Sequence, residues 1–514
     1  MILFYFAKKS TLISTVAFSV VIISLQAAHS FLTIRPPFQS GSPERLALTH
    51  DQLKWFDIEE RSQLQVCPFA GVSTNSEAIA GYFLPYNNSQ LNVGEFGSNF
   101  VANGNVDVIA NYFGIYTAAA PVVGNPIQPT LSNYTFQSVL SFRPKHTFAG
   151  VGLVYHYHIS PCLAKGFWIE VSTPIMYVRN TMGMGEKIIT SGGPNGNDPQ
   201  VPEGFVGNMT AAFRQNKFIF GRITGPTSSW GLADIEFKLG YTYGTGCNYH
   251  LDTYTGIHIP TGNKPKGEVV FEPIVGQNQH FGIFGGTVAG FKLWSNACSW
   301  VSLEIETVGK LFLGNTQIRA FDLYDRQWSR YIWMYTGKSS ILGKNPLPGI
   351  NFFSQACDVE PGSTRDLNTA FVFGNSYLQL EVGYHFFARE RETVVLEKQV
   401  VVQPALAAIW SNATNTFING GISRDGATIG NYAGIFNDVR YGAETYIPLT
   451  AANIDVETAA TPAAVTHTIY ATAGYHGAIR HYPAGFNIGA SYEFGKQNAA
   501  VDRLLVWAKF DIAW

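Results

Sequence analysis

The chain ends in the stretch DRLLVWAKFDIAW, residues 502–514, and this stretch decides the fold. Side chains of a β-strand alternate between its two faces, so the stretch divides into two sets. One set is apolar and consists of Leu504, Val506, Ala508, Phe510, Ile512 and the terminal Trp514. The other set carries the charges and consists of Arg503, Leu505, Trp507, Lys509, Asp511 and Ala513. The alternation predicts a strand with one apolar face, which a soluble sandwich and a membrane barrel both contain.

The same alternation recurs along the chain. Examples are FWIEVSTPIMYV (167–178), GLADIEFKLGYTYG (231–244), WVSLEIETVG (300–309), SYLQLEVGYHFF (376–387) and FNIGASYEF (486–494). In each stretch an apolar face with aromatic ends lies opposite a face that carries charges. A transmembrane barrel has this pattern, with apolar residues outside and polar residues inside. A soluble sandwich has the reverse sense and more charged residues on its surface.

Composition favours the membrane alternative. Only 14% of the 514 residues are charged, whereas soluble proteins average about 25%. No segment after the N-terminus approaches a continuous apolar run of about 18 residues, so spanning helices are not expected. A membrane protein without spanning helices must be a closed barrel, because lipid cannot satisfy free backbone groups. The net charge of −2 gives no reason to expect nucleic acid as a partner.

The N-terminus has the features of an export signal. Lys8 and Lys9 precede an uncharged apolar run over residues 11–25, and QAAHS follows with small residues near a cleavage point after Ala28 or Ser30. We therefore predict a signal peptide over residues 1–30, with an uncleaved anchor as the alternative. Residues 31–61 would form an N-terminal periplasmic segment, and residues 62–514 the barrel.

The expected fold is all-β: an antiparallel up-and-down transmembrane barrel of about sixteen strands. The predicted strands begin near Ser62, Val106, Tyr134, Phe148, Phe167, Trp230, Tyr249, His280, Trp300, Ser376, Thr393, Thr416, Asp438, Thr466, Phe486 and Arg503. Short turns such as SPCLAKG, GTGCNYH and SNACS would then lie on the periplasmic side. The long segments 179–229, 262–279 and 313–375 would be extracellular loops. Trp168, Trp294, Trp300 and Trp514 lie at strand ends near the turns and are expected to form an interfacial girdle.

The terminal strand also resembles a family signal. Trp514, with Ile512, Phe510 and Val506 at alternate positions before it, looks like the assembly signal of bacterial outer-membrane barrel proteins. In that family the barrel-insertion machinery reads this signal. The export signal, the strand pattern and the loop asymmetry resemble a porin over nearly the whole mature chain. The resemblance implies the outer membrane of a Gram-negative-type bacterium, with lipid as a partner, loops at the cell surface and a homo-oligomer left open.

Sites for chemistry are sparse. Of five cysteines, Cys162, Cys247 and Cys298 fall in predicted periplasmic turns, where disulfides among turns or between molecules are an open alternative to scattered small residues. His156 and His158 share a strand face, but a lone pair of histidines is usually polar lining and no third ligand is evident. We expect no metal, no cofactor and no enzymatic activity, because none of the usual catalytic motifs occurs.

The leading functional hypothesis is a porin for passive diffusion of small hydrophilic solutes and ions, because about sixteen strands leave an aqueous channel. The predicted pore lining consists of Glu170, Asp234, Glu236, Lys238, Glu304, Glu306, Glu381, Glu493, Lys509 and Asp511, and its excess of acids favours cations. The alternative is a surface structural or adhesion barrel that displays its long loops. A channel for hydrophobic molecules would need a lateral opening or an N-terminal plug, and residues 31–61 allow only a small plug.

One long segment has the composition of a pore constriction. NTQIRAFDLYDRQWSRYIWMY, residues 315–335, combines aromatic residues with the charged residues Arg319, Asp322, Asp325, Arg326 and Arg330. If this loop folds into the barrel, its opposed charges would create a transverse field across the pore. The alternative is an outward loop whose aromatic residues pack on one another or on a neighbouring subunit.

Overall fold

A computed structural model of the chain describes sixteen parts of it. They are residues 28–47, 62–94, 107–110, 136–159, 166–190, 206–246, 248–324, 327–331, 333–336, 347–375, 377–397, 404–406, 409–411, 416–418, 454–495 and 499–514.

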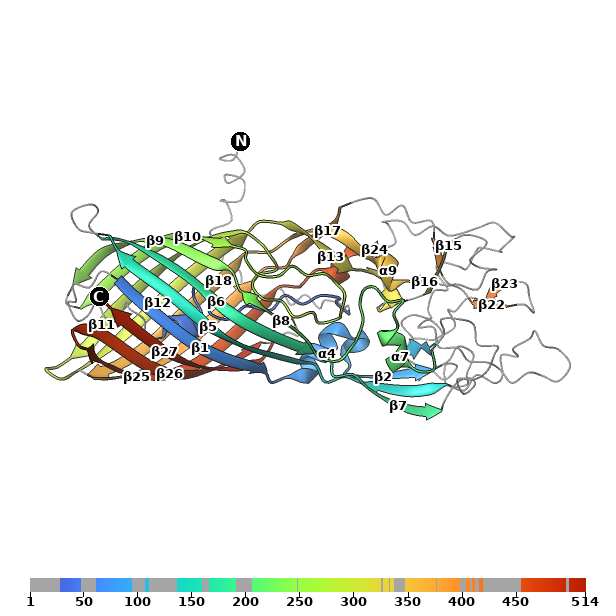
Figure 1. Cartoon of the computed structure of the whole chain (residues 1–514), viewed down its shortest axis with the longest axis horizontal. Helices are drawn as coiled ribbons and strands as arrows, with labels where there is room; N and C mark the ends of the chain where they lie inside the picture. The colour runs from blue at the N-terminus through green and yellow to red at the C-terminus, as the bar shows by residue number, and fades with distance from the viewer. Residues whose placement is uncertain are drawn as a thin grey trace, which may run out of the picture.

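The main sheet is a closed antiparallel barrel (Figure 1). Its strands are β1 (Ser62–Ser73), β5 (Lys145–His158), β6 (Phe167–Thr181), β8 (Thr227–Leu232), β9 (Ile235–Gly246), β10 (Tyr249–Ile259), β11 (Gly282–Ser295), β12 (Ser299–Phe312), β18 (Thr364–Asn375), β19 (Leu378–Arg389), β25 (Ala464–Ile479), β26 (Tyr482–Gly495) and β27 (Arg503–Ala513). The last strand closes the sheet by pairing with the first, Gln63 opposite Ala513. Because β8 and β9 pair one after the other with the same edge of β6, the wall is twelve strands around.

The barrel class is confirmed, but the predicted number of about sixteen strands is wrong. The predicted strands near Val106, Tyr134, Thr393 and Thr416 correspond to short strands outside the barrel, and Asp438 lies outside the described residues. Conversely, the barrel strand β18 was not predicted, and its residues were assigned to the extracellular loop 313–375. Its lower half, with Phe371, Val372 and Phe373 in a row, is apolar on both faces, so the alternation is hidden there.

The two faces of the barrel have the predicted sense. On β27 the side chains of Leu504, Val506 and Phe510 are exposed, whereas Lys509 and Asp511 point inward and are buried. Strands around the barrel repeat this pattern, so an apolar belt surrounds a polar interior. Such a belt is stable in lipid and not in water.

Inward aromatic side chains lie over glycines of neighbouring strands. Gly240 is directly opposite Trp168, and a Cβ atom at Gly240 would lie 2.1 Å from the indole ring. Two other pairs are arranged in the same way: Trp300 with Gly374, and Trp507 with Gly489. The glycines let these large rings lie against the wall, which leaves room in a narrow lumen.

This packing corrects part of the predicted tryptophan girdle. Trp168 and Trp300 are only 4% and 9% exposed and belong to the interior. Trp294 and Trp514 are 52% and 46% exposed, as an interfacial position requires. The alternation itself places Trp168 on the face of Glu170 and Trp300 on the face of Glu304, so the girdle prediction used their position near strand ends and overlooked the face.

The two ends of the barrel differ. The turns after β5, β9, β11, β18 and β25 are short and lie at the end that holds Trp514, at the left of Figure 1. The described parts of the long connections lie at the opposite end, which we call the loop end. Short turns at one end, long loops at the other and an apolar belt between them are the architecture of outer-membrane barrels, and the chain has this architecture.

Short elements cover the loop end and form a cap. The helices are α4 (Ser76–Phe83), η3 (Pro85–Asn87), α7 (Met209–Arg214), η5 (Ser329–Tyr331), α9 (Ile350–Phe353) and η7 (Val456–Ala459). The strands are β2 (Gln90–Gly94), β3 (Val108–Ile109), β4 (Gln137–Ser141), β7 (Gly185–Thr190), β13 (Asn315–Ala320), β14 (Asp322–Leu323), β15 (Trp333–Thr336), β16 (Leu347–Pro348), β17 (Ser354–Glu360), β20 (Thr393–Leu396), β21 (Pro404–Leu406), β22 (Ile409–Ser411), β23 (Thr416–Ile418) and β24 (Ile454–Asp455).

The cap has a hydrophobic core of its own. Phe83, Phe136, Phe213, Trp328 and Tyr331 are buried together there. Trp328 also donates from Nε1 to the carbonyl oxygen of Phe83 at 2.9 Å, so its polar atom is satisfied. The cap is therefore a packed body above the lumen. None of the described helices is long and apolar enough to cross a membrane.

Candidate functional site: a plugged lumen beneath a cap

An N-terminal segment fills the lumen. Residues 28–47, which we call the strap, run from the cap into the barrel (Figure 1). At the upper end the backbone N–H groups of His29 and Ser30 donate to carbonyl oxygens of Tyr82 and Thr458 in the cap. The strap includes residues 28–30, which the sequence pattern assigns to the signal peptide, and residues 31–47, which it assigns to a periplasmic segment.

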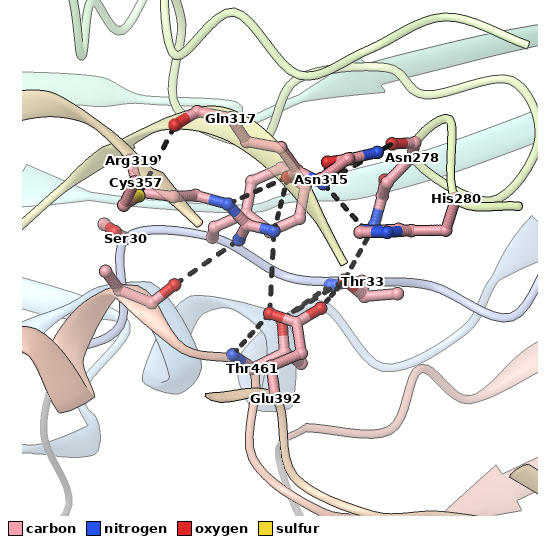
Figure 2. A network of polar contacts seen from close by, with 12 residues as sticks. Ser30, Thr33, Asn278, His280, Asn315, Gln317, Arg319, Cys357, Glu392 and Thr461 are labelled. Carbon is pink, nitrogen blue, oxygen red and sulfur yellow. Dashed lines mark hydrogen bonds and ion pairs between the residues drawn. The ribbon is translucent and has the colours of Figure 1, made fainter. Parts of the chain in front are cut away.

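The upper strap is clamped by Glu392 (Figure 2). Thr33 Oγ1 donates to Glu392 Oε1 at 2.5 Å, and the backbone N–H of Thr461 donates to Glu392 Oε2 at 2.9 Å. Arg319 Nη2 lies 3.5 Å from the same carboxylate, and its guanidinium lies 3.4 Å from the ring centroid of Phe31. Burial alone would raise the pKa of Glu392, but Arg319 and the Thr33 hydrogen bond lower it below its ordinary value.

A second set of polar contacts joins the strap to the cap. Asn278 Nδ2 donates to Thr33 Oγ1 at 3.0 Å, and Gln317 Nε2 lies 2.8 Å from His280 Nε2. His280 Nδ1 lies 2.8 Å from the carbonyl oxygen of Leu313, so Nδ1 carries the proton and Nε2 accepts from Gln317. Burial lowers the pKa of His280 to about 4, which keeps this ring neutral.

Further down, the strap is held by charges. Arg35 Nη2 lies 2.9 Å from Glu493 Oε2, and Arg503 Nε lies 2.5 Å from the same oxygen. Lys509 Nζ donates to the carbonyl oxygens of Arg45 and Ala47 at 2.7 and 2.6 Å. Two adjacent wall strands, β26 and β27, thus contribute to one ordered path for the strap.

The short helix α2 (Pro43–Leu46) places Arg45 in the middle of the barrel. Its guanidinium donates to both Glu170 and Glu236, on β6 and β9. Lys238 Nζ lies 3.0 Å from Glu170 Oε1, and Lys310 Nζ lies 3.3 Å from Glu236 Oε1. Buried charges are stable only when they are paired in this way. This layer ties the strap to the neighbouring strands β6 and β9 and, through Lys310, to β12.

The residues predicted to line a pore all point into the lumen. Those that are buried are Glu170, Asp234, Glu236, Lys238, Glu306, Glu381, Glu493, Lys509 and Asp511, and Glu304 is half-buried. Glu170, Glu236, Glu493 and Lys509 contact the strap directly. In this structure they enclose the strap, where the prediction had an aqueous channel.

The predicted constriction segment is divided. Arg319 contacts the strap at Phe31, and Arg330 donates to the strap carbonyl oxygen of Ala28. Arg330 also forms an ion pair of 3.0 Å with Asp322 in the cap. Asp322 also accepts from the backbone N–H groups of Trp328 and Arg330, so it shapes the turn before η5. Asp325 and Arg326 lie outside the described residues.

A small cavity lies where the strap enters the cap, and its lining is largely apolar but includes the polar side chains of His29, Glu272, Arg319 and Arg330. Its walls are largely Leu32, Phe83, Ile223, Val270, Phe271, Ile318, Trp328, Tyr331 and Ile350. Its volume is about 40 Å³, room for roughly three water molecules and far below the ~300 Å³ of ligand pockets. Because Phe31 and Leu32 of the strap form part of the wall, withdrawal of the strap would enlarge it.

Among the described strands the pairing of the barrel wall is broken along one edge of β8, which we call the break, whereas along β6 the pairing continues, since the Ala233 N–H donates to the carbonyl oxygen of Pro174 at 2.8 Å. The upper part of β6 pairs with β8, the lower part pairs with β9, and Ala233 and Asp234 lie between these two strands. Asp234 has a φ of 46°, in the left-handed region that few residues adopt without strain. In the described structure the other edge of β8 has no strand partner, because β10 ends at Ile259 opposite Ile235.

A loop covers the break from inside. Residues 262–279 were predicted as an extracellular loop, but they fold toward the strap, where Asn278 contacts Thr33. Asp234 anchors this loop by accepting from the backbone N–H groups of Thr261 and Gly262 at 3.2 Å and of Gln277 at 2.5 Å. The length of this loop could be predicted from the distance between the flanking strands in the sequence. No sequence feature indicated that the loop folds inward.

The cysteines and the histidine pair singled out in the sequence show no site for chemistry among the described residues. Cys298 is exposed with a free thiol, and Cys162 and Cys247 lie outside the described residues, so the disulfide prediction stays open. His156 Nε2 and His158 Nε2 are 3.2 Å apart. Across the described part of the chain, no group of three or more His, Cys, Asp or Glu side chains is placed to hold a metal ion.

Comparisons with known proteins give only distant similarities. No family model matches the chain, and no curated protein sequence does. A COG4313 outer-membrane channel from Pseudomonas putida F1 is similar at 8% identity over 89% of this chain and 97% of that chain, with a TM-score of 0.38. A FadL homologue from Pseudomonas aeruginosa has 12% identity over 95% of both chains and a TM-score of 0.30. The toluene transporter TbuX from Ralstonia pickettii has 8% identity over 89% and 90%, with a TM-score of 0.24.

Proposed function

We propose that the protein is an outer-membrane channel for small hydrophobic compounds and that the structure is its closed state. The observation that carries this proposal is the strap, which occupies the lumen below a largely apolar cavity. A porin for hydrophilic solutes needs a water-filled path, and here the charged lumen residues are buried around the strap. This closed lumen favours the hydrophobic-channel alternative, whose requirements were a plug or a lateral opening.

The chemistry of the cavity favours neutral compounds. Arg319 is paired with Glu392, and Arg330 is paired with Asp322, so both cations near the cavity are already compensated. Burial, aided by Arg330, lowers the pKa of His29 to about 4, so this ring is neutral at ordinary pH. A ligand that carries a charge would have to displace one of these pairs, whereas an apolar ligand needs only space.

The break along the unpaired edge of β8 offers an exit. An apolar compound released there would pass between strands into the lipid and would not have to cross an aqueous pore. The loop of residues 262–279 closes this route from inside and also contacts the strap through Asn278. Movement of the strap and opening of the wall would therefore be coupled.

The test compares uptake with conductance. Cells that produce the protein should accumulate a neutral aromatic hydrocarbon faster than cells that do not, while the purified barrel in planar bilayers should conduct little. Ala320→Phe would fill the cavity from β13 and should reduce uptake about tenfold, whereas Ala388→Phe on the outer surface of β19 should not. Steady conductance without hydrocarbon uptake would restore the porin hypothesis. Neither activity would favour the loop-display alternative.

A further inference from the structure

A group of basic residues lies on the outer surface at the loop end. Arg143, Lys145 and Arg179, which we call the rim patch, are all exposed. From Phe136 to Lys145 buried side chains alternate with side chains that are more exposed, so Arg143 and Lys145 share one face. Arg179 is on the adjacent strand opposite Thr147, and Lys145 is opposite Thr181. Lys145 and Arg179 are therefore diagonal neighbours, about 7–8 Å apart.

The rim patch begins where the apolar belt ends. Below it, the outward residues of β5 and β6 are apolar or aromatic except for Thr173: Ala149, Val151, Leu153 and Tyr155 on β5, and Phe167, Ile169, Val171, Ile175 and Tyr177 on β6. Ten residue steps separate Phe167 from Tyr177, or roughly 33 Å along the strand and roughly 23 Å along the membrane normal at a tilt of about 45°. This height matches the ~25 Å belt of outer-membrane barrels, so Arg179 lies at headgroup level.

Within the described ranges, no carboxylate compensates these charges. Residues 143–149, 175–181 and 227–232, which form the upper wall here, contain neither Asp nor Glu. None of the three basic residues makes an ion pair with a described residue. Elsewhere the rim is mixed, since Arg365 on β18 lies near Glu390, which accepts from the backbone of Ser363.

We propose that the rim patch binds the phosphate groups of a glycolipid in the outer leaflet. Arginine binds phosphate through two parallel hydrogen bonds, and the exposed hydroxyl group of Ser228, opposite Arg179 on β8, adds a further donor. The hydroxyl group of Thr147, on the other side, already donates to the carbonyl oxygen of Arg179 at 3.2 Å. The acyl chains of the same lipid would lie along the belt below, beside Trp230, which is 79% exposed. The acyl chains of a phosphorylated lipid insert beside the apolar belt and so hold its phosphate groups at the level of the rim patch. Free phosphate makes no contact with the belt, so its binding is not strengthened in this way. The inference does not depend on what the channel transports.

The test measures binding of lipopolysaccharide to the purified full-length barrel in detergent by native mass spectrometry. Wild type should bind intact lipopolysaccharide, and more weakly at high salt, because exposed charges are screened. The triple variant Arg143→Ser, Lys145→Ser, Arg179→Ser should bind lipopolysaccharide on the order of a hundredfold more weakly. Each basic residue near an anionic surface strengthens binding about fivefold, and the three factors multiply. Arg365→Ser is the matched control and should bind as wild type does.

Three outcomes would overturn the proposal. The first is that the triple variant binds lipopolysaccharide with the affinity of wild type. The second is that wild type binds lipopolysaccharide without phosphates as tightly as the intact lipid. The third is that millimolar inorganic phosphate displaces the lipid as well as excess lipopolysaccharide does. A gel shift on heating reports whether each variant is folded. If the triple variant does not fold, Arg179→Ser alone should weaken binding about fivefold, and unchanged binding in that variant would count against the patch.

Discussion

At the scale of single residues, Glu392 has an unusual number of roles. It compensates Arg319, accepts from Thr33 of the strap and accepts from Thr461 of the cap. Removal of one partner from such a buried group leaves an unpaired charge, which typically costs about 3–5 kcal/mol.

Glu392→Ala should therefore release the strap from the cap. The backbone amides of residues 30–35 should exchange hydrogen at least tenfold faster than in wild type, because their anchor is lost. Hydrogen–deuterium exchange followed by mass spectrometry measures this. Glu390→Ala, an exposed carboxylate two positions earlier, is the control and should leave strap exchange unchanged. Equal protection in Glu392→Ala would show that the clamp is dispensable.

Glycines opposite inward aromatic rings allow a second prediction. Gly240→Ala should destabilise the barrel by about 1–3 kcal/mol, because the new Cβ would lie 2.1 Å from the Trp168 ring. Gly309→Ala on β12 should be tolerated, because nothing lies within 4 Å of its added Cβ. Thermal unfolding in detergent compares the two variants. The same midpoint for both variants would mean that ring packing over glycine does not contribute to stability. In that case the double variant Gly240→Ala, Trp168→Leu should be no more stable than Gly240→Ala alone.

At the scale of elements, the break in the wall depends on one carboxylate. Asp234→Asn keeps a residue that tolerates positive φ but removes the charge that attracts three backbone N–H groups and His258, which lies 3.0 Å away. Hydrogen bonds to charged groups are worth about 1.5–3 kcal/mol. Amides of residues 261, 262 and 277 should exchange at least tenfold faster, whereas Asp358→Asn in the cap should not change them. Unaltered exchange would mean that the loop is held by its other contacts.

At the scale of the whole molecule, acid should loosen the cap from the strap. His280 is neutral in the fold, and its pKa of about 4 is below the ordinary value of 6.5. A base with a lowered pKa contributes full stability above pH 6.5 and loses it as the pH falls toward 4, by up to roughly 3 kcal/mol here. Glu392, whose pKa is also lowered, loses its contribution in the same direction at lower pH. Melting temperatures between pH 7 and pH 4 should fall less for His280→Gln than for wild type. Parallel curves for the two proteins would exclude His280 as a contributor.

The barrel and its orientation could be predicted from the sequence, but the interior of the lumen could not. Alternation fixes the face of Phe510 or Asp511 locally, and turn length fixes which end is which. The strap has no such period, since Arg35 and Arg45 are held by partners hundreds of positions away. The strand count failed because short strands of the cap, such as β4, look the same locally as wall strands. The assembly signal at Trp514 stays a prediction.

The course of the strap also constrains how the protein can be made. Its first residues lie in the cap, its last lie deep in the barrel, and β1 starts at the end opposite the cap. The N-terminal residues must therefore cross the bilayer through the interior of their own barrel. Once β27 has joined β1, the wall is a closed ring and threading would require a folded opening wide enough for Phe31 and Arg35. The simplest order of events is that the growing sheet curls around the strap and the terminal strand seals it inside.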